Sequence, residues 1–208
     1  MASKNRYSPR LAWFRAGIYF IACFAIAWWM GVPQTVFEQP LVSEIQLGDS
    51  TWWIATSVVT AHVLFAYLYF WPRGTVTHNR TGHPVATPLF GLLWGAAQGQ
   101  LAVSLYFAVE MFGVGDAVTA GLVIVIYSTW SGLWQSRFWD VYVTPEHNIP
   151  EWNTRKVLVA HVPYLILSVM HLMTFRNVGL FIIWQIVALT SSAWAMRFPT
   201  PWDKRAEE

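Results

Sequence analysis

Four polar residues recur along the apolar segment AHVPYLILSVMH, which covers residues 160–171. At the helical repeat of about 100° per residue, His161, Tyr164, Ser168 and His171 form one stripe. Ionisable side chains are costly inside a membrane and usually face the interior of a bundle or a wet cavity. The stripe predicts a site where His161 and His171 act as base or acid and Tyr164 donates an orienting hydrogen bond. The alternative is that these side chains only hold neighbouring helices together.

His62 lies in the middle of another apolar segment, at 52–71. If this segment and the one at 157–175 run in opposite directions, His62 and His161 lie at similar depths. Two histidines on different helices at one depth can hold haem b or a single metal ion. Pro163 adds a free acceptor, because it removes the backbone donor for the carbonyl of Val159. Two separately hydrogen-bonded histidines are the alternative interpretation.

Glu110 is the only carboxylate predicted inside an apolar segment, at 88–112. Buried without a cation it would serve as a general acid, whereas in the outer turn it would simply meet water. The same segment carries glycines at intervals of four, which predict a flat strip for close helix packing: Gly91, Gly95 and Gly99. Trp130, in the aromatic-rich stretch after residue 126, is a candidate for stabilising developing positive charge.

Two polar loops supply a further group of candidate metal ligands. Histidine and carboxylate side chains suit zinc or iron. The residues of this predicted site are His78, His83, Asp140, Glu146 and His147. In the alternative interpretation, the polar side chains of these loops cap helix ends.

The elements that must position these residues are membrane helices. Of the 208 residues, 55% are hydrophobic and 12% charged, which is unusual for a water-soluble domain. A window of roughly 20 residues, the span of a bilayer, picks out six apolar segments. They predict an all-α bundle of one domain with six transmembrane helices at 11–31, 52–71, 88–112, 117–135, 157–175 and 178–196. The single cysteine, Cys23, excludes a disulfide within the chain.

Lys and Arg accumulate on the cytoplasmic side of membrane proteins. With six spans and cytoplasmic termini, all 13 basic residues except Arg176 face the cytoplasm. The predicted location is therefore a bacterial-type plasma membrane with both termini inside. The net charge is only +2 and the sequence has no basic patch, so nucleic acid is not an expected partner.

Short loops leave almost no mass outside the membrane, so the expected ligands are membrane lipid and lipophilic small molecules. The leading hypothesis is an enzyme that acts within the bilayer on an isoprenoid, sterol-like or aromatic substrate by proton transfer or isomerisation. One alternative is a non-catalytic haem-binding or anchoring subunit, which would contact other membrane subunits or a second copy. A small carrier or channel is another, although the spans show no paired repeats.

Overall fold

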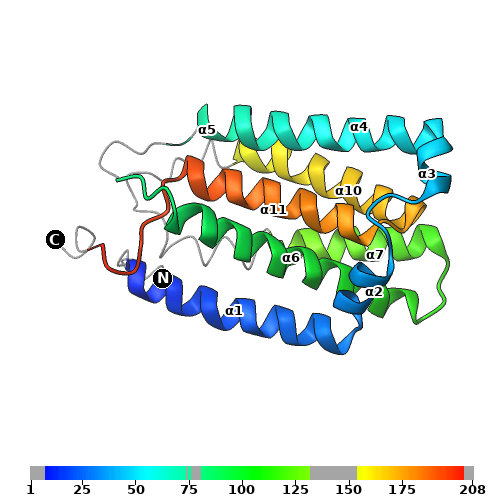
Figure 1. Ribbon diagram of the computed structural model, residues 1–208, viewed down its shortest axis with the longest axis horizontal. Helices are drawn as coiled ribbons and strands as arrows, with labels where there is room; N and C mark the ends of the chain where they lie inside the picture. The colour runs from blue at the N-terminus through cyan, green and yellow to red at the C-terminus, as the bar shows by residue number, and fades with distance from the viewer. Residues whose placement is uncertain (1–7, 74, 76–80, 132–153, 204–208) are drawn as a thin grey trace.

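The computed structural model describes residues 8–73, 75, 81–131 and 154–203, and every regular element in these ranges is helical. Figure 1 shows the long helices lying side by side along one axis. They are α1 (Pro9–Trp29), α4 (Ser50–Leu64), α6 (Ala86–Glu110), α7 (Asp116–Thr129), α10 (Val162–Phe175) and α11 (Val178–Ala195). Shorter elements are α2 (Val32–Glu38), α3 (Glu44–Gly48), α5 (Trp71–Arg73) and two π-helical segments, η1 (Phe65–Phe70) and η4 (Lys156–His161).

Five stretches of the described residues are long and apolar enough to cross a membrane. They are Pro9–Trp29, Ser50–Arg73, Ala86–Glu110, Lys156–Phe175 and Val178–Ala195. Their bounds agree closely with five of the predicted spans. The sixth predicted span, 117–135, begins with α7, which is apolar but only 14 residues long, and ends outside the described residues. The sixth crossing therefore stays a prediction.

Large apolar side chains cover the outside of the bundle. Ile21 on α1 is 72% exposed, Ile54 on α4 is 67% exposed and Val125 on α7 is 62% exposed. Soluble monomers rarely expose large contiguous apolar patches, whereas lipid chains solvate such surfaces. The length of the helices and the character of their outer faces together indicate an integral membrane protein.

A two-residue turn sets the direction of the last two long helices. Arg176 ends α10 in the left-handed conformation, with φ of 54°, and the Asn177 side chain accepts a hydrogen bond from the backbone N–H of Leu180. The Asn177 amide also donates to the carbonyl of Leu41, at 2.8 Å, which ties the turn to the loop before α3. Such a short connection makes α10 and α11 antiparallel neighbours.

Helix α6 packs closely against α11 along the predicted glycine strip. A Cβ atom added at Gly91 would lie 2.4 Å from the Cα of Thr190, and one added at Gly95 would lie 2.5 Å from the Cα of Ile186. At Gly99 the corresponding distance to the Cα of Ile182 is 3.2 Å. The prediction of a flat packing strip is confirmed, because the two backbones approach too closely for side chains at the first two positions.

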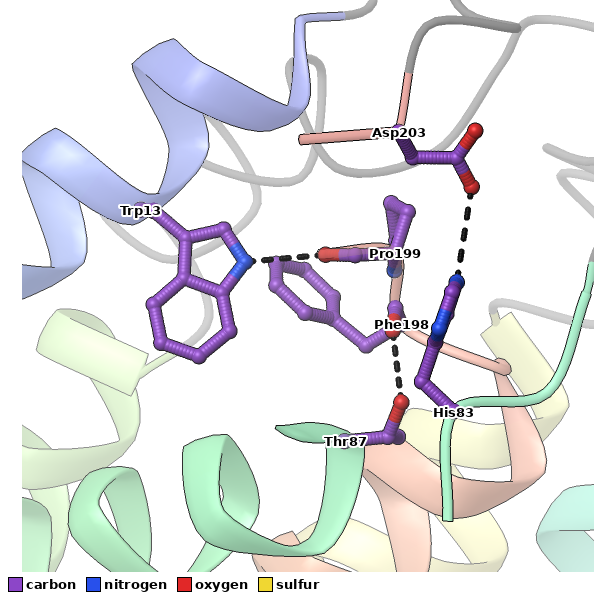
Figure 2. Close-up of polar contacts among 6 residues, drawn as sticks. All are labelled: Trp13, His83, Thr87, Phe198, Pro199 and Asp203. Atoms are coloured by element: carbon purple, nitrogen blue, oxygen red, sulfur yellow. Dashed lines mark hydrogen bonds and ion pairs between the residues drawn. The ribbon is translucent and has the colours of Figure 1, made fainter. Parts of the chain in front are cut away.

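The chain after α11 folds back onto α1 and α6 (Figure 2). The Thr87 hydroxyl donates to the carbonyl of Phe198 at 2.7 Å, and the Trp13 indole donates to the carbonyl of Pro199 at 2.8 Å. The ring of Phe198 stacks on Phe90 with centroids 3.9 Å apart. The beginning of α1 and the segment after α11 therefore lie at the same end of the bundle (Figure 1).

The glycine strip yields a test of the packing. Gly95→Ala should destabilise the protein by about 1–3 kcal/mol, because the new methyl group must push the α11 backbone away. Gly121→Ala is the matched control, since a Cβ there meets nothing within 4 Å. Thermal unfolding of both variants in detergent measures the difference. Equal melting temperatures would contradict the close contact between α6 and α11.

Candidate functional site

Three π-helical turns contribute to one region of the interior. Tyr67 lies in η1, His161 ends η4, and Ser131 lies in a π-helical turn that follows α7. π-helical turns are rare and often occur at functional sites. The turn in η4 comes directly before Pro163, which cannot donate a backbone hydrogen bond. Side chains from the other two turns, Tyr67 and Ser131, therefore converge on His161.

Both imidazole nitrogens of His161 form hydrogen bonds to side chains of other helices. Nδ1 lies 2.8 Å from the Tyr67 hydroxyl, and Nε2 forms a hydrogen bond with the Ser131 hydroxyl. A neutral imidazole has one donor and one acceptor, and each hydroxyl can play either role, so both tautomers fit these partners. Tyr67 and Ser131 are buried, at 1% and 4% exposure. We call Tyr67, Ser131 and His161 the His161 cluster.

Two more tyrosine hydroxyls lie beside the His161 cluster. The Tyr127 hydroxyl faces the Gln98 side chain and the Tyr164 hydroxyl faces Ser168, and neither has a partner within 3.5 Å among the described residues. Tyr164 follows His161 by three residues and Tyr127 precedes Ser131 by four, so each lies one helical turn from a cluster member. The ring of Tyr164 also contacts Tyr67 edge to face, with centroids 5.5 Å apart. Because neither of these contacts is a close hydrogen bond, both hydroxyls can also donate to a ligand or a water molecule.

His62 lies next to the cluster but bonds to the backbone. Its Nε2 atom is 3.1 Å from the carbonyl oxygen of Ala160. A carbonyl only accepts, so Nε2 of His62 carries the proton. The sequence predicts a free carbonyl at Val159, one residue earlier. The observed contact brings α4 and η4 directly together.

The pair of His62 and His161 does not fit a haem in this structure. Bis-histidine ligation needs one nitrogen from each imidazole aimed at an iron between them. Here Nε2 of His62 reaches the backbone of the helix that carries His161, and both nitrogens of His161 are hydrogen-bonded. The two helices are in direct contact at this hydrogen bond.

His171 has surroundings of a different kind. It follows His161 by ten residues, about 15 Å along a helix. Its Nε2 atom lies 2.9 Å from the Thr56 hydroxyl, and the ring packs against Trp184 and Phe175, each with centroids 4.8 Å away. The structure thus places His171 at the interface of α4, α10 and α11, away from the His161 cluster, which favours a packing role.

Glu110 ends α6 and forms an ion pair with Arg176, the residue that follows α10. The Tyr106 hydroxyl also donates to Glu110, at 3.2 Å. Arg176 lies fifteen residues after His161, roughly 22 Å along the helix axis. The carboxylate therefore has a cation beside it, at the end of the bundle opposite the chain termini. The structure does not bring Glu110 to His161.

Trp130 points toward α1. Its indole ring stacks on Tyr19 with centroids 6.2 Å apart, and its N–H donates to the Tyr19 hydroxyl at 3.4 Å. Trp130 precedes Ser131 in the chain, but its side chain contacts Tyr19 on α1. The proposal that Trp130 stabilises developing positive charge on a substrate stays a prediction.

Of the predicted metal ligands in the polar loops, only His83 lies in the described residues. Its Nε2 atom is 3.6 Å from a carboxylate oxygen of Asp203, in the segment after α11 (Figure 2). The other four predicted ligands lie outside the described residues: His78, Asp140, Glu146 and His147. The described part of the chain contains no group of three or more His, Cys, Asp or Glu side chains that could hold a metal ion.

Sequence reasoning identifies His161 and Tyr164 but misses Tyr67. Tyr67 stands among aromatic residues in FAYLYF, where an aromatic belt is the simpler interpretation. The helical pattern also puts Tyr127 and Ser131 on one face, yet gives no reason to join them to His161. Neither the π-helical turns nor the partner of each imidazole nitrogen has a signal in a single sequence.

Comparison of the chain with protein-family models, with curated proteins and with solved structures finds no match.

The packing role of His171 can be tested through its hydrogen-bond partner. Thr56→Val keeps the volume of the side chain but leaves Nε2 of His171 buried without a partner, which costs about 1–3 kcal/mol. Thr129→Val is the control, because Thr129 is exposed at the end of α7. Thermal unfolding in detergent compares the two. If Thr56→Val is no less stable than the control, the hydrogen bond does not support the fold.

Proposed function

We propose that this integral membrane protein is an enzyme that moves a proton on a lipophilic substrate within the bilayer, with His161 as base and acid. The observation that carries the proposal is the arrangement of His161 between Tyr67 and Ser131, beside two buried tyrosine hydroxyls that have no close hydrogen bond in the described part of the chain. General acid–base catalysis needs a group of this kind, held in a fixed orientation with adjustable neighbours.

The surroundings of the His161 cluster support a lipophilic substrate, although the buried ammonium of Lys156 lies over the Trp71 ring, 5.1 Å from its centroid. Within the described residues, no carboxylate or basic side chain forms a hydrogen bond or ion pair with Tyr67, Ser131 or His161. Aromatic rings line the region instead: Trp71 stacks on Tyr67 at 5.5 Å, and Tyr164 contacts it edge-on. An apolar wall with a few fixed polar groups is typical of sites for apolar ligands. Isoprenoid, sterol-like and aromatic compounds share this chemistry.

The haem-binding alternative loses its support, because the helices of His62 and His161 are in direct contact. A non-catalytic anchoring subunit would use these hydrogen bonds only to hold helices together, and it predicts that changing His161 alters stability and nothing else. A carrier would use His161 as a proton relay, and it predicts that changing His161 alters transport and leaves the composition of the lipids unchanged.

A change of His161 should therefore alter membrane lipids. In cells that express the chain, His161→Gln should slow conversion of the substrate by at least about 100-fold, the usual contribution of a general acid–base group. Mass spectrometry of total lipid extracts, compared with extracts from cells without the protein, identifies the compound that accumulates. Thr174→Val, an exposed position on the same helix, is the control. Expression is matched by immunoblot.

Identical lipid profiles for the wild type, His161→Gln and cells without the protein would refute the enzyme hypothesis. If the lipid profile depends on the amount of folded protein, and His161→Gln gives the wild-type profile at equal amounts of folded protein, the histidine has a structural role.

We also propose that the end of the bundle carrying the chain termini faces the cytoplasm of a plasma membrane. Apart from Arg176, the basic residues of the described helices and tail gather at that end: Arg10, Arg15, Arg73, Arg155, Lys156 and Arg197. Such an imbalance is typical of the cytoplasmic side.

Fusion reporters test this orientation. A fluorescent protein that folds only in the cytoplasm should be bright after residue 208, and alkaline phosphatase, which is active only outside, should be inactive there. Phosphatase inserted after residue 114, between α6 and α7, should be active. The reverse pattern would overturn the assignment.

A further inference from the structure

We propose that Ser131 is a nucleophile activated by His161, so that the site transfers the acyl group of a lipid ester. This inference rests on the proposed function, because it uses His161 as base and acid in the same site. It names Ser131 as the group from which His161 takes the proton and the departing alcohol of the substrate as the group that receives it. It also names acyl lipids as the class of lipophilic substrate.

The hydrogen bonds of His161 have the order that nucleophilic catalysis requires. Ser131 contacts Nε2, and Tyr67 contacts Nδ1 on the opposite side of the ring, at 2.8 Å. A weak nucleophile needs an adjacent base, and the base needs a third group that fixes its orientation. Ser131, His161 and Tyr67 fill these roles in that order. The third group here is a phenol instead of the carboxylate of a serine protease.

The hydrogen bond of Ser131 differs from those of other serines in the bundle. Ser104 and Ser192 each donate to the carbonyl four residues earlier in their own helix, at 2.8 Å, and Ser168 donates to the carbonyl of Leu165 at 3.2 Å. This local bond is the usual way for serine to satisfy its hydroxyl in a membrane helix. Ser131 instead bonds across helices to an imidazole, as an activated nucleophile must.

The hydroxyls of Tyr127 and Tyr164 can donate hydrogen bonds to the negatively charged oxygen that forms during acyl transfer. Tyr127 and Tyr164 are each 1% exposed, and each is one helical turn from a member of the Ser131–His161 pair. Attack on an ester carbonyl places negative charge on its oxygen, and preorganised donors in a site without water stabilise that charge strongly. The two phenols are the donors available for this oxygen.

The reaction balances with an ester and water, or an ester and a second alcohol. The Ser131 oxygen attacks the acyl carbon while His161 takes the hydroxyl proton, and the bond from the acyl carbon to the ester oxygen breaks. His161 gives the proton to the departing alcohol, which leaves an acyl group on Ser131. Water or an acceptor alcohol then attacks this ester, with His161 again taking and returning the proton. No oxidant or metal enters the reaction.

A covalent probe tests the nucleophile without knowledge of the substrate. The full chain, purified in detergent and reconstituted in phosphatidylcholine vesicles, is treated with alkyl fluorophosphonates of short and long chain length. Such probes phosphonylate activated serines with loss of fluoride. Peptide mass spectrometry of the wild type should find the adduct on Ser131. Because the site is mapped in the wild type, this result does not depend on whether a variant folds.

Variants then assign the roles. Ser131→Ala should abolish labelling, and His161→Gln should slow it by at least about 100-fold. Ser192→Ala, whose hydroxyl bonds only to its own helix, should label like the wild type. Tyr67 is a positioning residue, so Tyr67→Phe should lower the maximal labelling rate and leave the probe concentration for half-maximal rate unchanged. Thermal unfolding confirms that each variant is folded.

Two outcomes separate this inference from the proposed function. If neither probe modifies Ser131, and Ser131→Ala converts lipid like the wild type while His161→Gln does not, the nucleophile is overturned and the acid–base function stands. If no adduct forms and neither variant changes the lipid profile, both are overturned.

Discussion

Polar side chains within a membrane must find their partners inside the bundle, because hydrocarbon offers none. This constraint explains the contacts between helices that are far apart in the sequence. The Trp184 indole donates to the Thr60 hydroxyl at 3.1 Å, His62 donates to the carbonyl of Ala160, and His161 joins Tyr67 to Ser131. Each bond fixes the rotation of one helix against another. The His161 cluster is thus part of the framework as well as the candidate site.

The close approach of α6 and α11 is the second element of this framework. Helices that meet along glycines hold their backbones at short range, and the remaining helices must pack around that pair. α6 contacts α1 and α7 as well as α11, and is the most buried of the long helices. Gln98 of α6 is fully buried on the inner side, at 0% exposure. The glycine strip therefore also determines how near α6 comes to the tyrosines around His161.

Most of the helical framework could be predicted from the sequence. Runs of apolar residues set the spans, and Ser8, Asp49 and Asn177 mark three helix starts where the structure shows their side-chain caps. The glycines at intervals of four correctly indicate a packing face. In the loop after α1, the short helix α3 also begins with a capping box, formed by Ser43 and Gln46, whereas α2 has no side-chain cap.

The candidate site could be predicted only in part. The stripe through His161 and Tyr164 follows from helical periodicity, but a regular repeat of 3.6 residues also groups His171 with them, and it lies too far along the helix. Tyr67 shares a buried face with Val59 and Val63, at intervals of four residues, but nothing in the sequence joins that face to His161. Which side chains form hydrogen bonds between helices depends on tertiary packing, and a single sequence does not show that packing.

The contact between α6 and α11 joins segments that the ribosome makes at different times. When α6 is inserted into the membrane, its glycine face has no packing partner until residues 182–190 of α11 have been synthesised. The nascent bundle stays open on that side during synthesis, and the last hairpin, α10 with α11, closes it. Two halves of the chain, divided before this hairpin, accordingly carry complementary faces through which separately made fragments can reassemble.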